Sequence, residues 1–170
     1  MDSVEGASGA DAEAVDFDRF FADEYRRLFR ALLLICRDRP EADDIAQEVF
    51  VRVFERWDRV GRMDAPVSYL YRTALNEYRN RVRRAIRWGR RTLFVREGGD
   101  EVSEAALART EVSHALGALT RDQREAVVLV EFVGLRSDEA GAVLGVSAGA
   151  IRARVTRARA ALREGRDDDG

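Results

Sequence analysis

The sequence predicts an all-α fold, and the spacing of its apolar residues is the main reason. Apolar side chains recur every three or four positions along most of the 170 residues, as they do on one face of a helix. The β-branched residues follow the same spacing and do not alternate with polar residues, so no strand is predicted. Hydrophobic residues make up 46% of the chain and charged residues 35%, which suits a folded domain with a core and a charged surface.

Three helices are predicted in the first half of the chain. The first begins after Asp16, which suits a helix N-cap, and ends before Pro40. The second runs roughly from Glu41 to Trp57 and carries an apolar stripe toward the core. A loop from Asp58 to Pro66 separates it from a third helix that continues to about residue 88, and proline suits the first turn of that helix.

A change of composition divides the chain into two parts. Residues 89–110 contain a Gly-Gly pair and mixed charges, which predicts a linker. We therefore expect two small helical domains, residues 16–88 and 111–164. Acidic tails are expected at residues 1–15 and 165–170.

The second domain shows clear helix-capping signals. Thr120 and Gln123 have the spacing of a capping box and open a helix that ends near Gly134. Ser137 and Ser147 then suit the N-caps of two more helices. Gly145 stands in the tight connection between these two helices, so the pattern predicts a helix-turn-helix.

The last predicted helix has one apolar and one basic face. Ile151, Val155, Ala158 and Leu162 share the apolar face, and arginines dominate the opposite one. Such a helix after a short helix and a glycine turn is typical of the element that lies in a DNA major groove. A solvated basic face without a ligand is the alternative.

Charge is sorted along the chain, although the net charge is only −2. Nine arginines lie between residues 72 and 96 and six between residues 147 and 166, while both ends are acidic. The arginine ridge of the third helix is interpreted as a phosphate-binding surface. Tyr69 and Tyr71 near its start are interpreted either as core residues or as a platform for unpaired bases.

The second predicted helix carries an acidic, partly apolar stripe. Asp44, Glu48 and Glu55 share one face with Gln47 and Val51. We favour a docking face for a basic helical partner, because Val51 among acids gives a mixed interface. A solvated face is the second interpretation, and the metal site of a nuclease, formed by Asp43, Asp44 and Glu48, is the third.

Few other kinds of site fit this composition. The chain has one cysteine, Cys36, and one histidine, His114, so an intramolecular disulfide and a Cys/His zinc site are excluded. Cys36 follows an apolar run and is expected in the core. The longest apolar run, residues 31–36, is too short for a membrane span, and no secretion signal is recognised. We expect a cytoplasmic protein without a cofactor.

Three blocks of sequence stand in the order found in one protein family. "ADDIAQEVFVRVFERW" is similar to sigma region 2.2, "SYLYRTALNEYRNRVRR" to regions 2.3 and 2.4, and residues 118–162 to region 4. The chain thus resembles the extracytoplasmic-function (group IV) sigma factors of bacterial RNA polymerase, in the sigma-70 superfamily. The resemblance implies a non-enzymatic protein that binds core RNA polymerase and directs transcription initiation at specific promoters. It also implies that an anti-sigma factor could bind in an apolar groove between the two domains.

The resemblance assigns roles to three groups of residues. The group for core polymerase is Asp44, Gln47, Glu48, Val51 and Glu55. The group for the minus-10 element is Arg62, Tyr69, Arg72, Asn76, Arg79, Asn80 and Arg83. The group for the minus-35 element is Ser147, Arg152, Ala153, Arg154, Thr156, Arg157 and Arg159. The loop from Asp58 to Pro66 would hold an unstacked base of the minus-10 element.

Three residues depart from the family pattern, and one other function class remains open. Tyr69 stands where the family usually has tryptophan, and Asn80 where it commonly has aspartate. Gly141 stands where the family has alanine, and glycine inside a helix costs up to about 1 kcal/mol. A stand-alone helix-turn-helix regulator would account for residues 111–166 but would leave the first domain without a role.

Overall fold

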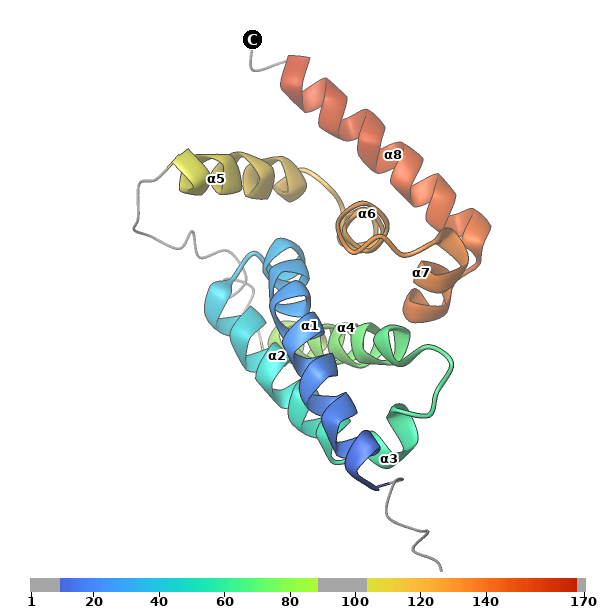
Figure 1. The fold of residues 1–170 in the computed structure, drawn as a ribbon. Coiled ribbons are helices and arrows are strands. Elements are labelled where there is room, and N and C mark those ends of the chain that lie inside the picture. Colours follow the sequence, from blue (N-terminus) through green and yellow to red (C-terminus); the bar gives the residue numbers. More distant parts are fainter. Residues whose placement is uncertain (1–9, 89–103, 168–170) are drawn as a thin grey trace, which may run out of the picture.

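The structure is a computed structural model that describes residues 10–88 and 104–167, with side chains for residues 17–88 and 111–165. Every regular element in the described part of the chain is a helix, which confirms the predicted all-α class (Figure 1). The helices form two modules, one on each side of residues 89–103, which lie outside the description. None of the described helices is long and apolar enough to cross a membrane.

The first module consists of four helices. They are α1 (Ala10–Cys36), α2 (Arg39–Phe54), α3 (Trp57–Val60) and α4 (Pro66–Arg87). Helix α2 runs back along α1, and α4 packs against both (Figure 1). Asp38 caps α2, and its carboxylate accepts a hydrogen bond from the backbone N–H of Glu41 at 2.9 Å.

Two predicted boundaries in this module are wrong. Helix α1 begins at Ala10, so Asp16 is not its N-cap and part of the expected acidic tail, residues 10–15, is helical. Helix α2 ends at Phe54, because the chain turns there, and the short helix α3 then begins at Trp57 and extends into the predicted loop. The third predicted helix is confirmed, with Pro66 in its first turn.

The second module begins earlier than predicted. Its elements are α5 (Glu104–Gly117), α6 (Arg121–Val127), the π-helical turn η1 (Val128–Phe132), α7 (Ser137–Leu144) and α8 (Ala148–Asp167). Residues 104–110, expected in the linker, are therefore helical. The expected C-terminal tail starts inside α8, and residues 168–170 lie outside the description.

The helix caps of the second module follow the sequence closely. The capping box is confirmed, since Thr120 and Gln123 exchange hydrogen bonds of 3.3 and 3.0 Å between side chain and backbone. Gly145 has a φ of 71°, which supplies the left-handed turn, and Ser147 Oγ accepts from the N–H of Ala150 at 3.1 Å. The cap at Ser137 is off by one residue, because Arg136 precedes the first helical turn.

The two modules pack against each other around a continuous core. Helix α7 lies against α4, and α6 and η1 lie against α1 (Figure 1). Buried residues from both modules, among them Leu32, Leu75, Leu129 and Ile151, form one hydrophobic cluster. Cys36 belongs to this core, as predicted, and burial raises the pKa of its thiol well above the usual value.

Candidate nucleic-acid and protein interfaces

Helix α8 presents one face to the core and one to solvent. Ile151, Val155 and Ala158 are buried, as the periodicity predicts, while Leu162 is half-buried. On the opposite side Arg152, Thr156 and Arg157 are exposed, and so is Ser147 at the start of the helix. Ala153 is half-buried between the two faces. The helix-turn-helix thus presents a short basic surface to solvent, as a helix that enters a DNA groove requires.

Two arginines of the predicted minus-35 group are held by carboxylates of the same module. Arg154 Nη2 donates to Asp122 Oδ2 at 2.8 Å, and its side chain is mostly covered. Arg159 is ion-paired with Glu131 of η1. These two guanidinium groups therefore flank the exposed surface of α8, and their carboxylate partners set their direction.

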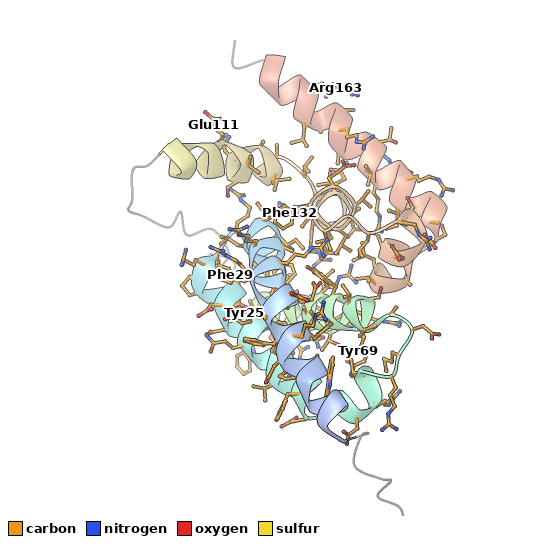
Figure 2. The ribbon with its side chains drawn as sticks, in the orientation of Figure 1. Tyr25, Phe29, Tyr69, Glu111, Phe132 and Arg163 are labelled. Atoms are coloured by element: carbon orange, nitrogen blue, oxygen red, sulfur yellow. The ribbon has the colours of Figure 1, made fainter. Side chains whose placement is uncertain are left out.

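The predicted minus-10 residues lie along α4 and the loop before it. Arg72, Asn76, Asn80 and Arg83 are exposed on one side of the helix, and Arg62 is exposed in the loop. Tyr69 is half-buried near the start of α4 (Figure 2).

The two tyrosines at the start of α4 differ in their surroundings. Tyr69 accepts a hydrogen bond from Arg56 Nη1 at 3.3 Å and keeps part of its ring accessible. Tyr71 is only 1% exposed, which decides between its two interpretations in favour of the core. Burial raises its pKa far above the usual value.

Arg79, the central residue of the minus-10 group, contacts the second module. Its Nε donates to Glu125 Oε1 at 3.3 Å, and its Nη2 forms a second hydrogen bond to Glu125 Oε2. Glu125 lies on α6 and is 0% exposed. The bidentate bond raises the pKa of Arg79 and fixes the plane of its guanidinium.

A basic cleft of about 280 Å³ opens beside this ion pair. It brings Arg79 and Arg83 of the minus-10 group next to Arg154 of the minus-35 group. Arg121, Asp122, Leu144 and Val146 complete its lining. The sequence did not identify Asp122 and Glu125 as partners of these arginines, because the pairing depends on how the chain packs.

The acidic stripe of α2 is exposed, with an apolar centre. Asp44, Gln47 and Glu55 are exposed beside Val51, which is 57% exposed. Phe54, 62% exposed, lies one turn beyond Val51 on the same helix, and the sequence pattern assigned it no role. Its ring packs against Phe17 of α1 at a centroid distance of 4.9 Å. The surface thus combines carboxylates with a rigid apolar patch.

Glu48 behaves differently from the rest of the stripe. It is half-buried, accepts from Arg81 Nη2 at 2.6 Å and forms an ion pair with Arg52. Both arginines also bind the buried carboxylate of Glu77 on α4, at 3.0 and 3.1 Å. Burial raises the pKa of Glu77, but hydrogen bonds from Arg81 and Arg52 outweigh it and leave the pKa below its usual value. Glu48 therefore helps to hold α2 against α4.

Two of the three acids considered for a metal site, Asp43 and Glu48, are engaged by other side chains. Asp43 accepts from Tyr25 Oη at 3.2 Å and from Gln47 Nε2 at 2.9 Å. Among the described residues no group of three or more His, Cys, Asp or Glu side chains could hold a metal ion. The geometry of α2 offers no support to the nuclease interpretation.

Both modules match known protein families. Residues 20–88 match the family described as Sigma-70 region 2, and residues 109–162 match Sigma-70, region 4. The ECF RNA polymerase sigma factor SigM of Mycobacterium tuberculosis is 34% identical over 148 residues, covering 86% of this chain and 74% of SigM. The RNA polymerase sigma-E factor of Streptomyces avermitilis is 27% identical over 163 residues, covering 91% and 87% of the two chains.

Solved structures resemble the whole arrangement. CnrH, solved in complex with the cytosolic domain of CnrY, has a TM-score of 0.71 and 30% identity, covering 95% of this chain and 96% of CnrH. The sigma factor RpoE of Bartonella quintana, solved with the anti-sigma factor NepR, has a TM-score of 0.76 and 24% identity. That match covers 88% of this chain and 95% of RpoE, and it shows a shared fold.

Proposed function

The chain belongs to the extracytoplasmic-function group of sigma-70 family sigma factors, and from this premise we propose how its surfaces divide the work of promoter-specific transcription initiation. It is an RNA polymerase sigma factor that binds core polymerase and promoter DNA. A stand-alone helix-turn-helix regulator is not favoured, because the family matches extend over both modules in the order of a sigma factor. That order, in one chain, is the observation that carries the assignment.

The exposed stripe of α2 is proposed to bind core polymerase. Asp44, Gln47 and Glu55 supply polar contacts around Val51, and Phe54 enlarges the apolar centre. Carboxylates around an apolar centre fit a basic partner surface and orient it during encounter. Glu48 belongs to the same surface, but we assign it mainly to positioning α2, because Arg81 and Arg52 already bind its carboxylate.

The exposed side of α4 is proposed to bind the minus-10 element. Arg72, Asn76, Asn80 and Arg83 face solvent in a row, and arginine and asparagine side chains suit phosphates and base edges. The loop with Arg62, together with the accessible part of Tyr69, is proposed to hold an unstacked base. Arg79 is proposed to join this row of DNA-binding residues when its hydrogen bonds to Glu125 are broken.

The exposed side of α8 is proposed to read the minus-35 element in the major groove. Arg152 and Arg157 can reach base edges or phosphates, and the methyl group of Thr156 suits an apolar contact with thymine. Ala153 leaves room for the groove wall, while Arg154 and Arg159 are proposed to contact flanking phosphates. The hydroxyl of Ser147, beside the first turn of α8, is proposed to donate or accept a hydrogen bond with the minus-35 DNA.

Regulation and location follow from the same assignment. We propose that the protein acts in the cytoplasm with RNA polymerase and has no catalytic activity of its own. An anti-sigma factor is also proposed as a partner, since the neighbour RpoE was solved with the anti-sigma factor NepR and the neighbour CnrH with a second protein, the cytosolic domain of CnrY.

The polymerase assignment is tested by reversing one charge. Asp44→Arg should weaken binding of the full chain to purified core polymerase by about tenfold or more, because it replaces an exposed carboxylate of the stripe with a positive charge. Glu111→Arg is the matched control, since Glu111 is exposed on α5 in the other module (Figure 2). Equal affinities for the two variants, measured by fluorescence anisotropy with labelled chain, would contradict a polymerase surface on α2.

A further inference from the structure

We propose that the basic cleft between α4 and the second module binds a small anion with two linked phosphate groups, either inorganic pyrophosphate or the pyrophosphate group of a nucleotide. The cleft has a volume of about 280 Å³ and is lined by residues of α4, α6, α7 and α8 and of the turn between the last two helices. This ligand is neither polymerase nor promoter DNA, so the site adds a function to those proposed above.

Arginine side chains dominate the lining of the cleft. Arg79 and Arg83 come from α4, Arg121 from α6 and Arg154 from α8, whereas Asp122 is the one acidic residue in the lining that the structure describes. Like charges that line one small volume repel one another, and an anion between them relieves this repulsion. The forked N–H donors of arginine suit phosphate oxygens, which they bind in parallel pairs of hydrogen bonds. The cleft therefore favours a polyvalent phosphate ligand.

Two of these arginines are already held in place by carboxylates. Arg154 Nη2 donates to Asp122 Oδ2 at 2.8 Å, and Arg79 Nε donates to Glu125 Oε1 at 3.3 Å. Their side chains are only 21% and 22% exposed, so an anion that binds them orders little that is not ordered before. A guanidinium has more N–H donors than these bonds use, which leaves donors on both groups for a ligand.

The other two arginines supply charge that is loosely paired. Arg83 is exposed, and its described hydrogen bond is to the amide oxygen of Asn80, a neutral group on the same helix. Arg121 is exposed too and lies 4.0 Å from Glu125, whose carboxylate is already bound by Arg79. An incoming anion therefore gains charge-assisted hydrogen bonds from Arg83 and Arg121 without first breaking a close ion pair.

The size of the cleft and its donors indicate two linked phosphates. Sites that enclose drug-sized ligands run from about 300 to 1,000 Å³, and this cleft lies just below that range. Four guanidinium groups offer more donors than one phosphate can satisfy in parallel pairs, whereas a pyrophosphate group has oxygens for all of them. Leu144 and Val146 add an apolar part to the lining, which suits the ribose or base of a nucleotide.

Isothermal titration calorimetry of the full chain measures the site without DNA, polymerase or divalent metal. Inorganic pyrophosphate and ADP are the probes, while inorganic phosphate and sulfate at equal ionic strength measure general attraction of anions. We expect one saturable site per chain that binds pyrophosphate at least about tenfold more tightly than phosphate. Binding of ADP as tight as that of pyrophosphate would identify the ligand as a nucleotide, and weaker binding of ADP would identify it as inorganic pyrophosphate. Equal affinities for all four anions, or no saturable site, would overturn the proposal.

Single substitutions place the site in the cleft. Arg83→Gln and Arg121→Gln should each weaken pyrophosphate binding by about tenfold, because each removes one guanidinium and leaves the pair of Arg154 with Asp122 intact. Arg163→Gln is the matched control, since Arg163 is exposed near the far end of α8 and should leave the affinity unchanged (Figure 2). Circular dichroism checks that every variant is folded. Equal losses in Arg83→Gln and Arg163→Gln would show a general attraction to the basic chain and refute the site.

One consequence rests on the proposed function, because Arg83 and Arg154 are also proposed to contact promoter DNA. Saturating pyrophosphate should then weaken binding of a labelled minus-35 duplex to the full chain, measured by fluorescence anisotropy, more than sulfate of equal ionic strength does. Pyrophosphate binding in the calorimeter without such competition would leave the anion site established and contradict the role of Arg154 in DNA binding. Loss of the calorimetric signal alone would refute the anion site and leave the proposed function untouched.

Discussion

Replacing Gly141 by alanine should destabilise the protein, although helix propensity alone predicts the opposite. Gly141 lies inside α7, and its carbonyl oxygen accepts hydrogen bonds from the N–H groups of Gly145 and Val146, the latter at 3.0 Å. After Gly145 the chain folds back over α7, so the carbonyl oxygen of Val146 lies against Gly141. A Cβ atom there would stand 2.6 Å from that oxygen.

The magnitude follows from two opposing terms. Alanine gains up to about 1 kcal/mol over glycine in a helix interior. Forcing an extra methyl group into a packed site costs about 1 to 3 kcal/mol, and here the contact is backbone, which cannot turn aside as a flexible side chain can. We expect the free energy of unfolding to fall by about 1 kcal/mol, and the turn that positions α8 to shift with it.

The assay is urea unfolding of the full chain, followed by circular dichroism. Gly149→Ala is the matched control, because a Cβ atom there would lie 3.8 Å from its nearest neighbours, Arg152 and Ser147. That variant should be more stable than the unchanged chain by about 0.5 kcal/mol. The reasoning is refuted if Gly141→Ala gains as much stability as Gly149→Ala.

Three further predictions concern the core, the helix contacts and the DNA surface. Ile151→Ala, at a fully buried position, should cost about 2 to 5 kcal/mol of unfolding free energy, measured in urea. Glu77→Gln should cost about 1 to 3 kcal/mol at pH 7, because Arg52 and Arg81 lose their shared buried carboxylate and keep only the half-buried carboxylate of Glu48. The pKa of Glu77 is lowered in the folded chain, so this stabilisation holds above the usual value of 4.5 and fades as the pH falls through the folded-state pKa; a loss independent of pH would contradict it. Arg157→Ala should cost about 1 to 3 kcal/mol of promoter binding, unequally across minus-35 sequences, whereas Arg163→Ala, further along α8, should act uniformly in gel-shift titrations.

Local features of the fold could be predicted because they depend on a few neighbouring residues. The capping box of Thr120 and Gln123 and the glycine turn at Gly145 need only residues within one turn of the chain. The apolar face of α8 follows from helical spacing in the same way. Together these local signals are enough to predict the helix-turn-helix and the side of α8 that faces solvent.

Features that depend on packing between distant residues could not be predicted. Nothing near Arg79 in the sequence indicates that its partner is Glu125, on a helix of the other module. Arg81 binds the carboxylates of both Glu48 and Glu77, and this arrangement likewise depends on how α2 lies against α4. The burial of Tyr71, which removes it from the candidate stacking residues, has the same origin.

The predicted starts of α1 and α5 are wrong because the sequence signals for the first residue of each helix are weak. Asp16 is a good N-cap residue, but the helical pattern also extends to its N-terminal side, and α1 starts at Ala10. The Gly-Gly pair suggested a linker up to residue 110, while α5 already begins at Glu104. In both cases the helix begins earlier in the chain than the prediction placed it.

Transcription in vitro tests the central claim most directly. Purified full-length chain is added to core polymerase on fragmented DNA of the source genome, and the 5′ ends of the transcripts are sequenced. We expect transcripts that depend on the added chain, start at a limited set of sites and share two upstream elements at constant spacing. Transcripts at random positions, or none above those of core polymerase alone, would contradict it.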